Sequence, residues 1–565
     1  MFMGFHFHSS WLLIILIFWL ILFIWIYPVS AADSAVGKEV IINQNGYLPE
    51  MPKWVVATRK ADKFTLVNEQ TLGKVYFGKL SPVFDPTSKR QIWRGEFTGL
   101  HTPGTYRIEV PGVGCSYPFS IATGIYNKVF ELGTRFFYLQ RCGINLNDQE
   151  SGLCHPACHC KDGYIARQDL FNQQDDLFSS VGGWHDAGDY GKYVTTTTIT
   201  VAHMLLAFEL WPRKFSDGQL RIPESGNGIP DILDEARYGL EWLFTMQRSD
   251  GAVYHKIGGQ FWAGFESPDQ DIQKRFVYGI STADTAKFTA TMAIAARALD
   301  KCDPQLAERA SKAAFKAWSF LESHQFLWDH HKSDDQGSGA YSISNDSEDR
   351  LWAALELSTL KLQNKFLEKF ISQFKDYQPQ AIGWSSSGVI GLFDYARSAY
   401  AEPEWRKIAV HKVVSLAGQY LTVARASGYH YTLNFQEFLW ASNKEGLSRG
   451  AVLLMADLLQ PDPQYRQNAL AQLDFILGFN PLSKCFVSGL GTNTVTDLHH
   501  RFAAAAGKSI PGALAGGPNN LAESGIEQPG QGPFSYVDFQ LSYSSNEPAI
   551  DYNAALIFIS AAFVD

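Results

Sequence analysis

The chain has 565 residues, of which 46% are hydrophobic and 19% charged, and its formal net charge is −9 at pH 7. A chain of this length exceeds what one hydrophobic core supports, so we expect two or three folded units. The negative charge argues against nucleic acid or an anionic membrane surface as a partner and suits a neutral substrate.

The chain begins with an apolar segment. Residues 11–27 are almost wholly apolar, and residues 28–31 (PVSA) supply small residues suited to cleavage after Ala31. We therefore interpret residues 1–31 as a secretory signal peptide. The alternative is an uncleaved anchor, because the segment carries no Lys or Arg before its apolar run and that run is long. Either way we expect an exported protein, and after cleavage a secreted one, extracellular or periplasmic, with no stable membrane partner.

Residues 38–122 have the pattern of a small β-domain. Short β-type runs alternate with turn signals such as Asn45-Gly46, Pro103-Gly104 and Pro111-Gly112. Regular spacing of this kind predicts a small β-sandwich that packs against the C-terminal part of the chain. The seven predicted strands are 39–43, 53–58, 63–67, 74–77, 91–97, 105–110 and 116–121.

From residue 124 to the C-terminus the pattern is helical. Twelve helices in one domain can close as a ring of helical hairpins with long loops over one end, and we predict this arrangement for 124–565. A less regular α-bundle is the alternative. Long loops inside a compact domain usually carry function. The amphipathic runs are 124–141, 194–212, 229–247, 282–300, 305–324, 347–360, 363–375, 388–400, 403–425, 445–460, 462–478 and 548–563.

The stretch at 182–189 (GGWHDAGD) places two carboxylates three residues apart. Its Asp, Gly and Ala do not suit a helix interior, so we predict a loop entering a helix near Thr195. Gly188 would let the backbone turn and aim Asp186 and Asp189 into one small space. Such a pair can hold and deprotonate a water molecule. The alternative is a capping loop with solvated aspartates.

Two polar clusters near the C-terminus are candidate partners of this loop. His499 and Arg501 alternate along the chain, so in an extended loop they face one side and offer donors to sugar hydroxyls. Glu547 precedes the last predicted helix among Tyr, Phe and Pro, where desolvation would keep it protonated as a general acid. The alternative for the first cluster is a loop with a purely structural role. The alternative for Glu547 is an acidic residue that the dipole of the last helix favours at its N-terminus.

A base on one loop and an acid on another are what inverting glycoside hydrolysis needs. The acid protonates the leaving oxygen while the base activates water on the opposite face of the sugar ring. Their carboxyl groups are then expected to lie about 6.5–9.5 Å apart.

The three clusters together resemble the signatures of glycoside hydrolase family 9, the family of many endoglucanases (cellulases). The stretch at 182–189 resembles its base motif, 488–501 its histidine signature and 536–553 its acid signature, over a match from about 125 to the C-terminus. Residues 44–49 (QNGYLP) resemble the start of the immunoglobulin-like domain that precedes some members.

This resemblance implies an immunoglobulin-like sandwich over 38–122 and an (α/α)6 barrel over 124–565. It implies hydrolysis of β-1,4-glucosidic bonds with inversion. We predict a monomer that cleaves internal bonds of cellulose or related β-glucans. Asp189 would be the base, Asp186 would help hold the attacking water and Glu547 would be the acid. The resemblance places His499 and Arg501 at the sugar near the cleaved bond, and Asp538 at a further position of the signature. We count His499 and Asp538 among the catalytic candidates and Arg501 among the substrate-binding ones.

Aromatic residues are candidates for stacking on sugar rings. Among them Trp440, in the segment 439–443 (LWASN), resembles a family position that lines the site, and Tyr552 is a further substrate-binding candidate. The full set comprises Trp184, Trp262, Trp352, Trp384, Trp440, Tyr543 and Tyr552.

The chain departs from the family pattern before His499, where 494–498 (TVTDL) lacks the usual prolines, and at Cys485, where serine is frequent. The alternative function is an exo-acting β-glucosidase or glucosaminidase on short oligosaccharides with the same fold and mechanism. A non-catalytic carbohydrate-binding protein is disfavoured, because all three candidate carboxylates are present.

Four side chains form a candidate metal site. Cys142, Cys158, His159 and His185 supply two thiolates and two imidazoles, which is a closed set suited to structural zinc, and some immunoglobulin-bearing family members resemble this. Such a metal would clamp the loop that carries Asp186. The odd count of 7 cysteines argues against a simple disulfide framework. The alternatives are a disulfide or other ligands drawn from Cys154, His155 and Cys160.

A second set of oxygen donors, on one predicted turn, suits calcium. Asn227, Asp231, Asp234 and Glu235 are ligand types that calcium takes. We favour a helix start with Pro230 near its first turn for these residues. The resemblance leaves calcium as a second cofactor elsewhere in the domain.

Overall fold

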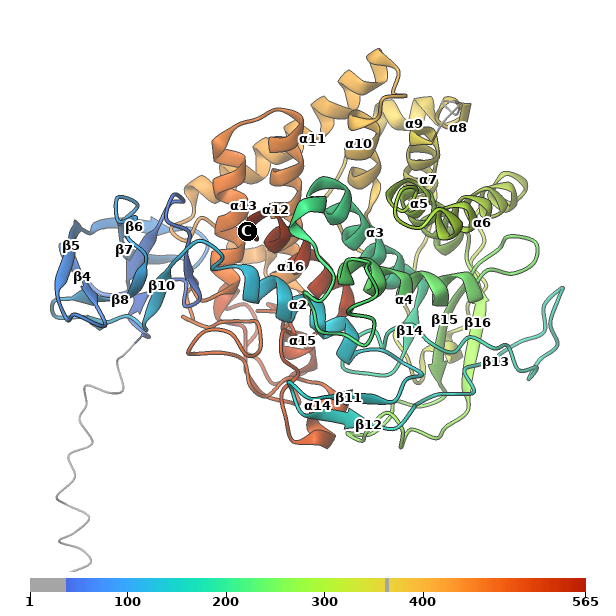
Figure 1. Cartoon of the computed structure of the whole chain (residues 1–565), viewed down its shortest axis with the longest axis horizontal. Helices are drawn as coiled ribbons and strands as arrows, with labels where there is room; N and C mark the ends of the chain where they lie inside the picture. The colour runs from blue at the N-terminus through green and yellow to red at the C-terminus, as the bar shows by residue number, and fades with distance from the viewer. Residues whose placement is uncertain (1–36, 361–364) are drawn as a thin grey trace, which may run out of the picture.

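A computed structural model describes residues 37–360 and 365–565 as two folded units (Figure 1). The predicted signal peptide, residues 1–31, lies outside the described residues. Within the described part, none of the helices has the length and apolar character needed to cross a membrane.

The N-terminal unit is a sandwich of two β-sheets, as predicted. One sheet has the order β1-β3-β7-β6 and the other β2-β10-β8-β4-β5, with β9 paired to β8. Their facing sides bury a core that includes Phe64, Phe97, Tyr106 and Phe119. The strands are β1 Val40–Ile41, β2 Gly46–Tyr47, β3 Trp54–Ala57, β4 Lys63–Asn68, β5 Lys74–Lys79, β6 Ser81–Asp85, β7 Arg90–Glu96, β8 Gly104–Val110, β9 Gly114–Cys115 and β10 Phe119–Ile121.

Three strands of the sandwich were not predicted. β2 and β9 have two residues each, too few for a periodic pattern. β6 contains Pro82, which argues against a strand, but β6 lies at the edge of its sheet, where a missing N–H donor costs no ladder bond.

The C-terminal unit is a closed double ring of helices. The inner ring runs α3, α5, α7, α10, α12 and α16, and α16 packs back on α3. The outer helices pack behind it, for example α4 on α3 and α6 on α5. The bounds are α2 Asn127–Leu139, α3 Val194–Leu210, α4 Asp231–Thr245, α5 Thr282–Ala298, α6 Pro304–Ser323, α7 Ser347–Thr359, α8 Lys365–Glu368, α9 Ile371–Asp376, α10 Gly388–Arg397, α11 Pro403–Ala426, α12 Ser442–Leu459, α13 Pro463–Ile476 and α16 Ile550–Phe563.

Burial separates the two rings. All 14 residues of α16 are buried, whereas α11, with 24 residues, buries only a stripe that includes Ala409, Val413, Ala417 and Leu421. A helix apolar all round belongs in an interior and one with a single apolar stripe at a surface. The packing of the inner helices and this difference in burial confirm the predicted ring. The run predicted at 363–375 is divided into α8 and α9, and its first two residues are outside the described part.

A small sheet beside the barrel was not predicted. Its order is β13-β16-β15-β14, and a separate pair joins β11 and β12. All six residues of β15 are buried, including His255 and Lys256, so no polar–apolar alternation marks it. The bounds are β11 Leu146–Asp148, β12 Leu153–His155, β13 Tyr164–Ile165, β14 Lys192–Tyr193, β15 Tyr254–Gly259 and β16 Arg275–Ile280, and the short helices are α14 Arg501–Ala506 and α15 Tyr543–Asn546.

The sandwich supports one loop of the helical unit directly. The Asn43 side chain donates to Asp474 on α13 at 2.6 Å. The Gln44 side-chain oxygen accepts the backbone N–H groups of Thr492 and Asn493 at 3.0 and 2.8 Å. The sandwich thus fixes the segment that leads to His499.

Candidate active site

A cleft of about 920 Å³ opens at the end of the barrel where the inner helices begin. Residues at the N-termini of three inner helices, α3, α12 and α16, line it, so the positive ends of these helix dipoles face the cleft. The predicted residues Asp186, Asp189, Glu547, His499 and Arg501 all lie in its wall. Its aromatic lining consists of Tyr193, Trp262, Tyr341, Trp384, Trp440, Tyr543 and Tyr552.

The base loop lies directly before α3, as predicted, but the structure gives Gly188 another role. Its φ is not positive; instead, a Cβ there would lie 2.0 Å from the carbonyl oxygen of His499. The Gly188 N–H donates to Glu547 at 3.2 Å and its carbonyl accepts the Arg501 N–H at 2.9 Å. Only glycine allows this close approach, which brings the base loop against both C-terminal clusters.

Asp186 is buried and firmly held. One carboxylate oxygen accepts from the Thr196 hydroxyl and the other from the Tyr341 hydroxyl, each at 2.5 Å. Burial, followed by the charges of Asp551 and Asp189, raises the pKa of Asp186 well above its usual value. Asp189 is 7% exposed and accepts the Gly191 N–H at 2.9 Å. One oxygen of Asp189 is thereby anchored while the other has no protein donor among the described residues.

Glu547 lies between α15 and α16 and faces the same cleft. Burial, and then the negative charge of Asp189, raises the pKa of Glu547 to about 8, although Arg501 opposes the shift. Glu547 therefore keeps its proton near neutral pH, which is the state a general acid requires.

His499 and Arg501 face the cleft from one loop. The His499 Nδ1–H donates to the Gln540 carbonyl at 2.7 Å, and burial lowers the pKa of His499, so the ring is neutral with Nε2 as an acceptor. The Arg501 Nε donates to the Ala263 carbonyl at 2.8 Å. Its buried Nη1 has no partner among the described residues. A polar ligand in the cleft would satisfy this donor.

The stacking candidates fall into two groups. Trp440 is 42% exposed, and its Nε1 donates to the Tyr552 hydroxyl at 3.0 Å. Trp184 and Trp352, by contrast, are fully buried and bonded to Glu235 and Glu356, so they cannot stack on a sugar. A high tryptophan content in the sequence does not show which indole rings face the cleft and which are buried in the core.

Asp538 does not line the cleft. Its carboxylate pairs with Lys484 at 2.7 Å and accepts the N–H groups of Thr496 and Asp497. The carboxylate therefore ties the loop before His499 to the loop before Glu547. These bonds fix the shape of the loop that leads to His499.

Three further cleft residues were not singled out as site residues from the sequence. Tyr341 bonds Asp186 across 155 residues of chain. The Lys444 Nζ lies 3.9 Å from the Asp551 Oδ2 in the cleft wall. Long-range contacts of this kind have no spacing that the sequence displays.

A buried glutamine clamps the base loop. The Gln140 amide donates to the carbonyls of His185 and Ala187, which flank Asp186, at 3.1 and 2.8 Å. Its oxygen accepts from the His500 Nε2 at 2.8 Å, because the Nδ1 of His500 already accepts the Ala503 N–H. Gln140 thus joins the base loop to the His–Arg loop.

We predict that Gln140→Met lowers kcat about 100-fold, because misplacing a reacting group by about 1 Å has that effect. Gln140→Glu keeps the acceptor for His500 and regains one donor only when protonated. Its activity relative to the parent should therefore rise as pH falls, and that of Gln140→Met should not. Profiles of kcat against pH for both variants test this prediction. A ratio of variant to parental kcat that stays near one at every pH for both variants would contradict it.

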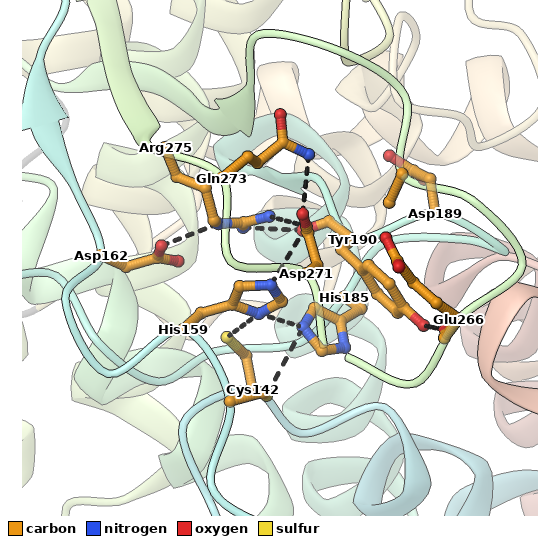
Figure 2. A network of polar contacts seen from close by, with 12 residues as sticks. Cys142, His159, Asp162, His185, Asp189, Tyr190, Glu266, Asp271, Gln273 and Arg275 are labelled. Carbon is orange, nitrogen blue, oxygen red and sulfur yellow. Dashed lines mark hydrogen bonds and ion pairs between the residues drawn. The ribbon is translucent and has the colours of Figure 1, made fainter. Parts of the chain in front are cut away.

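The Cys2His2 group is assembled as predicted. Figure 2 shows three of its members, Cys142, His159 and His185. His159 Nδ1 lies 3.1 Å from His185 Nε2 and 3.6 Å from Cys142 Sγ, and Cys158 Sγ lies 4.0 Å from His185 Nε2. Tetrahedral zinc with about 2.0 Å to nitrogen and 2.3 Å to sulfur would place its ligand atoms about 3.3–3.8 Å apart. The four side chains fit this ion. All 7 cysteines are free of disulfides.

The calcium candidates are already used by the protein. Asp231 accepts the N–H groups of Gly218 and Leu220 at 2.9 and 2.7 Å. Glu235 pairs with Arg141 at 2.8 Å, and Asn227 donates to Asp234 at 3.1 Å. Among the described residues, the Cys2His2 group is the one cluster of His, Cys, Asp or Glu close enough to hold an ion.

A double ring of helices, with a carboxylate pair and a glutamic acid of raised pKa facing an aromatic cleft, is the arrangement of a glycoside hydrolase of the (α/α)6 class. The chain belongs to glycosyl hydrolase family 9, whose model matches residues 126–560. The model of the cellulase N-terminal ig-like domain matches residues 35–115. The predicted resemblance is thereby confirmed.

Relatives match over nearly the whole chain. Endoglucanase D of Acetivibrio thermocellus is 33% identical over 94% of this chain and 84% of its own length. A xyloglucan-specific endo-beta-1,4-glucanase of Bacteroides ovatus is 30% identical over 94% and 95%. A crystal structure of a metagenome-derived family 9 endoglucanase has a TM-score of 0.90 at 41% identity and covers 93% of this chain and 98% of its own. A Zn-binding triple mutant of the family 9 endoglucanase J30 has a TM-score of 0.88 at 33% identity over 92% and 99%.

Proposed function

We propose that the protein is a secreted, inverting endo-β-1,4-glucanase acting on cellulose or related β-glucans. The observation that carries this proposal is the pairing of Asp186 and Asp189 with a Glu547 of raised pKa, about 8, across one cleft. The endoglucanase relatives support the substrate class. The apolar run in 1–31 supports secretion.

In this mechanism Glu547 donates its proton to the glycosidic oxygen as the bond to the leaving sugar breaks. Asp189 takes a proton from a water molecule that attacks the anomeric carbon from the opposite face. Asp186, fixed by Thr196 and Tyr341, orients that water. The opposite faces of attack and departure give inversion.

The sugar at the cleaved bond is held by polar groups of the His–Arg loop. Arg501 Nη1 offers a donor that lacks a protein partner among the described residues, and neutral His499 offers an acceptor at Nε2. Trp440 presents a half-exposed ring against which a sugar face can pack.

We also propose that Cys142, Cys158, His159 and His185 hold a structural zinc. Their closed ligand set leaves no position for substrate, so the metal would fix the base loop and supply no chemistry. The existence of a Zn-binding variant of a family 9 relative supports this assignment.

The test is hydrolysis of a soluble β-1,4-glucan with viscosity and reducing ends followed together. An endo-acting enzyme lowers viscosity before much sugar appears. Slow release of one small sugar at constant viscosity would instead support the exo-acting alternative. No hydrolysis by the intact zinc-loaded protein would overturn the proposal.

The pH dependence of activity should report Glu547. Because its pKa is raised to about 8, the acid form is present below that pH and is lost as pH rises through it. We predict that kcat/KM stays high up to about pH 7 and falls tenfold per pH unit above about pH 8. The profile of kcat/KM on a soluble glucan measures this. An alkaline decline already complete by pH 6 would contradict it.

A further inference from the structure

The loop between β15 and β16, residues 260–274, forms one wall of the cleft. Trp262 on this loop lines the cleft and is 49% exposed. The Arg501 guanidinium lies 5.6 Å from the Trp262 ring centroid. A half-exposed ring beside a sugar-binding arginine is placed to pack on a further sugar unit.

The loop also touches the catalytic loops. The Ala263 carbonyl accepts from Arg501, and the Phe265 ring packs edge-on against His499 with centroids 5.4 Å apart. The Glu266 carbonyl accepts from the Tyr190 hydroxyl, beside Asp189 (Figure 2). The position of the loop therefore affects how these side chains meet a substrate.

The far end of the loop is tied to the Cys2His2 group. Asp271, whose side chain is 4% exposed, lies with Oδ2 3.3 Å from the His159 Nε2. Its Oδ1 accepts from the Gln273 side chain at 2.8 Å. Gln273 then bonds the N–H and carbonyl of Phe261 at 3.1 and 3.0 Å, next to Trp262. A path of hydrogen bonds thus leads from the candidate metal ligand His159 to the backbone of Phe261, the chain neighbour of the exposed Trp262.

The chemistry of this path is that of a metal-bound histidine. With Nδ1 of His159 facing the ligand cluster, Nε2–H is the donor to Asp271, and a carboxylate there fixes the ring and its tautomer. The same carboxylate holds the loop through its second oxygen. One side chain thus serves both the metal site and the cleft wall.

We propose that Asp271 is a positioning residue that couples the zinc site to the loop 260–274, and that Trp262 is a specificity-determining aromatic that this loop presents to a sugar ring of the β-glucan. The proposal rests on the proposed glucanase function and on zinc as the metal.

Asp271→Asn is a sharp probe because it keeps the size of the side chain. The aspartate receives hydrogen bonds on both oxygens and also pairs with Arg275 at 3.9 Å, whereas asparagine is uncharged and offers one oxygen and one NH₂ group. Either the His159 bond or the Gln273 bond must be lost. Asp269→Asn is the matched control, since that carboxylate is in the same loop but bonds only the Ser267 hydroxyl among the described residues.

The experiment compares the zinc-loaded parent with Asp271→Asn, Trp262→Ala, the double variant and Asp269→Asn. Zinc release to a chromogenic chelator and kcat and KM on a soluble β-1,4-glucan are measured. Asp271→Asn should release zinc about 10–100-fold faster, which is the usual effect of losing such a partner. Trp262→Ala should raise KM about tenfold, or about 1.4 kcal/mol, with zinc release and kcat unchanged. Asp269→Asn should match the parent.

The double variant tests the coupling. If Asp271 acts through the loop, Asp271→Asn also raises KM, and the rise in KM of the double variant is smaller than the product of the two single effects. Gln273→Met breaks the path on the loop side alone. It should raise KM and leave the rate of zinc release at the parental value. It therefore tests the coupling even if the Asp271 variant fails to fold.

Four results would overturn the proposal: parental zinc release and KM in Asp271→Asn, parental KM in Trp262→Ala, fully multiplicative effects, or a purified parent without zinc. A parent that binds zinc but does not hydrolyse the glucan would overturn the proposed function and the role of Trp262. In that case zinc release from Asp271→Asn still decides the role of Asp271.

Discussion

Asp189→Asn and Glu547→Gln should each lower kcat on a soluble β-1,4-glucan about 10²–10⁴-fold, which is the usual contribution of a general base or acid. Asparagine cannot accept the proton of the attacking water, and glutamine cannot supply one to the leaving oxygen. Both substitutions keep the size of the side chain, so KM should change far less than kcat. Initial rates of reducing-end formation measure the effect.

The leaving group distinguishes the two roles. A dinitrophenyl β-cellobioside has a leaving group that departs without a proton, so Glu547→Gln should hydrolyse it with much of the parental rate. Asp189→Asn should remain impaired on both substrates because water still has to be activated. Equal losses on the activated substrate would contradict the assignment of Glu547 as the acid, and a parental kcat in Asp189→Asn would contradict that of the base.

Much of the barrel was predictable because its helices must bury apolar surface. The stripe Ala409, Val413, Ala417 and Leu421 has the helical period, and Pro403 marks its first turn. The same principle fails for β15. His255 and Lys256 are buried there because they pair with Asp284 and Asp335, respectively. A charge paired inside the protein looks like a surface charge in the sequence.

The candidate site was predictable where its residues are close in sequence and not where they are distant. Asp186 and Asp189 share one motif, but Gln140 reaches its partner His500 across 360 residues. Asp538 stays a prediction, because a place in a signature does not show what a carboxylate contacts. In the structure it bonds Lys484 and two backbone N–H groups, which hold the loop before His499.

Removing the metal should destabilise the fold before it abolishes the reaction. A ligand present at 1,000 times its Kd stabilises the folded state by about 4 kcal/mol, and chelation would remove that contribution. Cys142→Ser should do the same, whereas Cys154→Ser, an exposed cysteine outside the cluster, should not. We expect one zinc per chain by elemental analysis and a thermal unfolding temperature several degrees lower in both the chelated protein and Cys142→Ser.

Below its own unfolding temperature the zinc-free protein should still turn over, because the four ligands leave no position at which the metal could contact substrate. Its KM should rise and its kcat fall partially, since His185 adjoins Asp186 and the metal would restrain that loop only indirectly. Added zinc should restore both constants, and calcium should not. Complete loss of turnover at unchanged thermal stability would instead identify the metal as catalytic. Unchanged stability with full activity would show that hydrogen bonds alone, chiefly those of Gln140, hold the base loop in place.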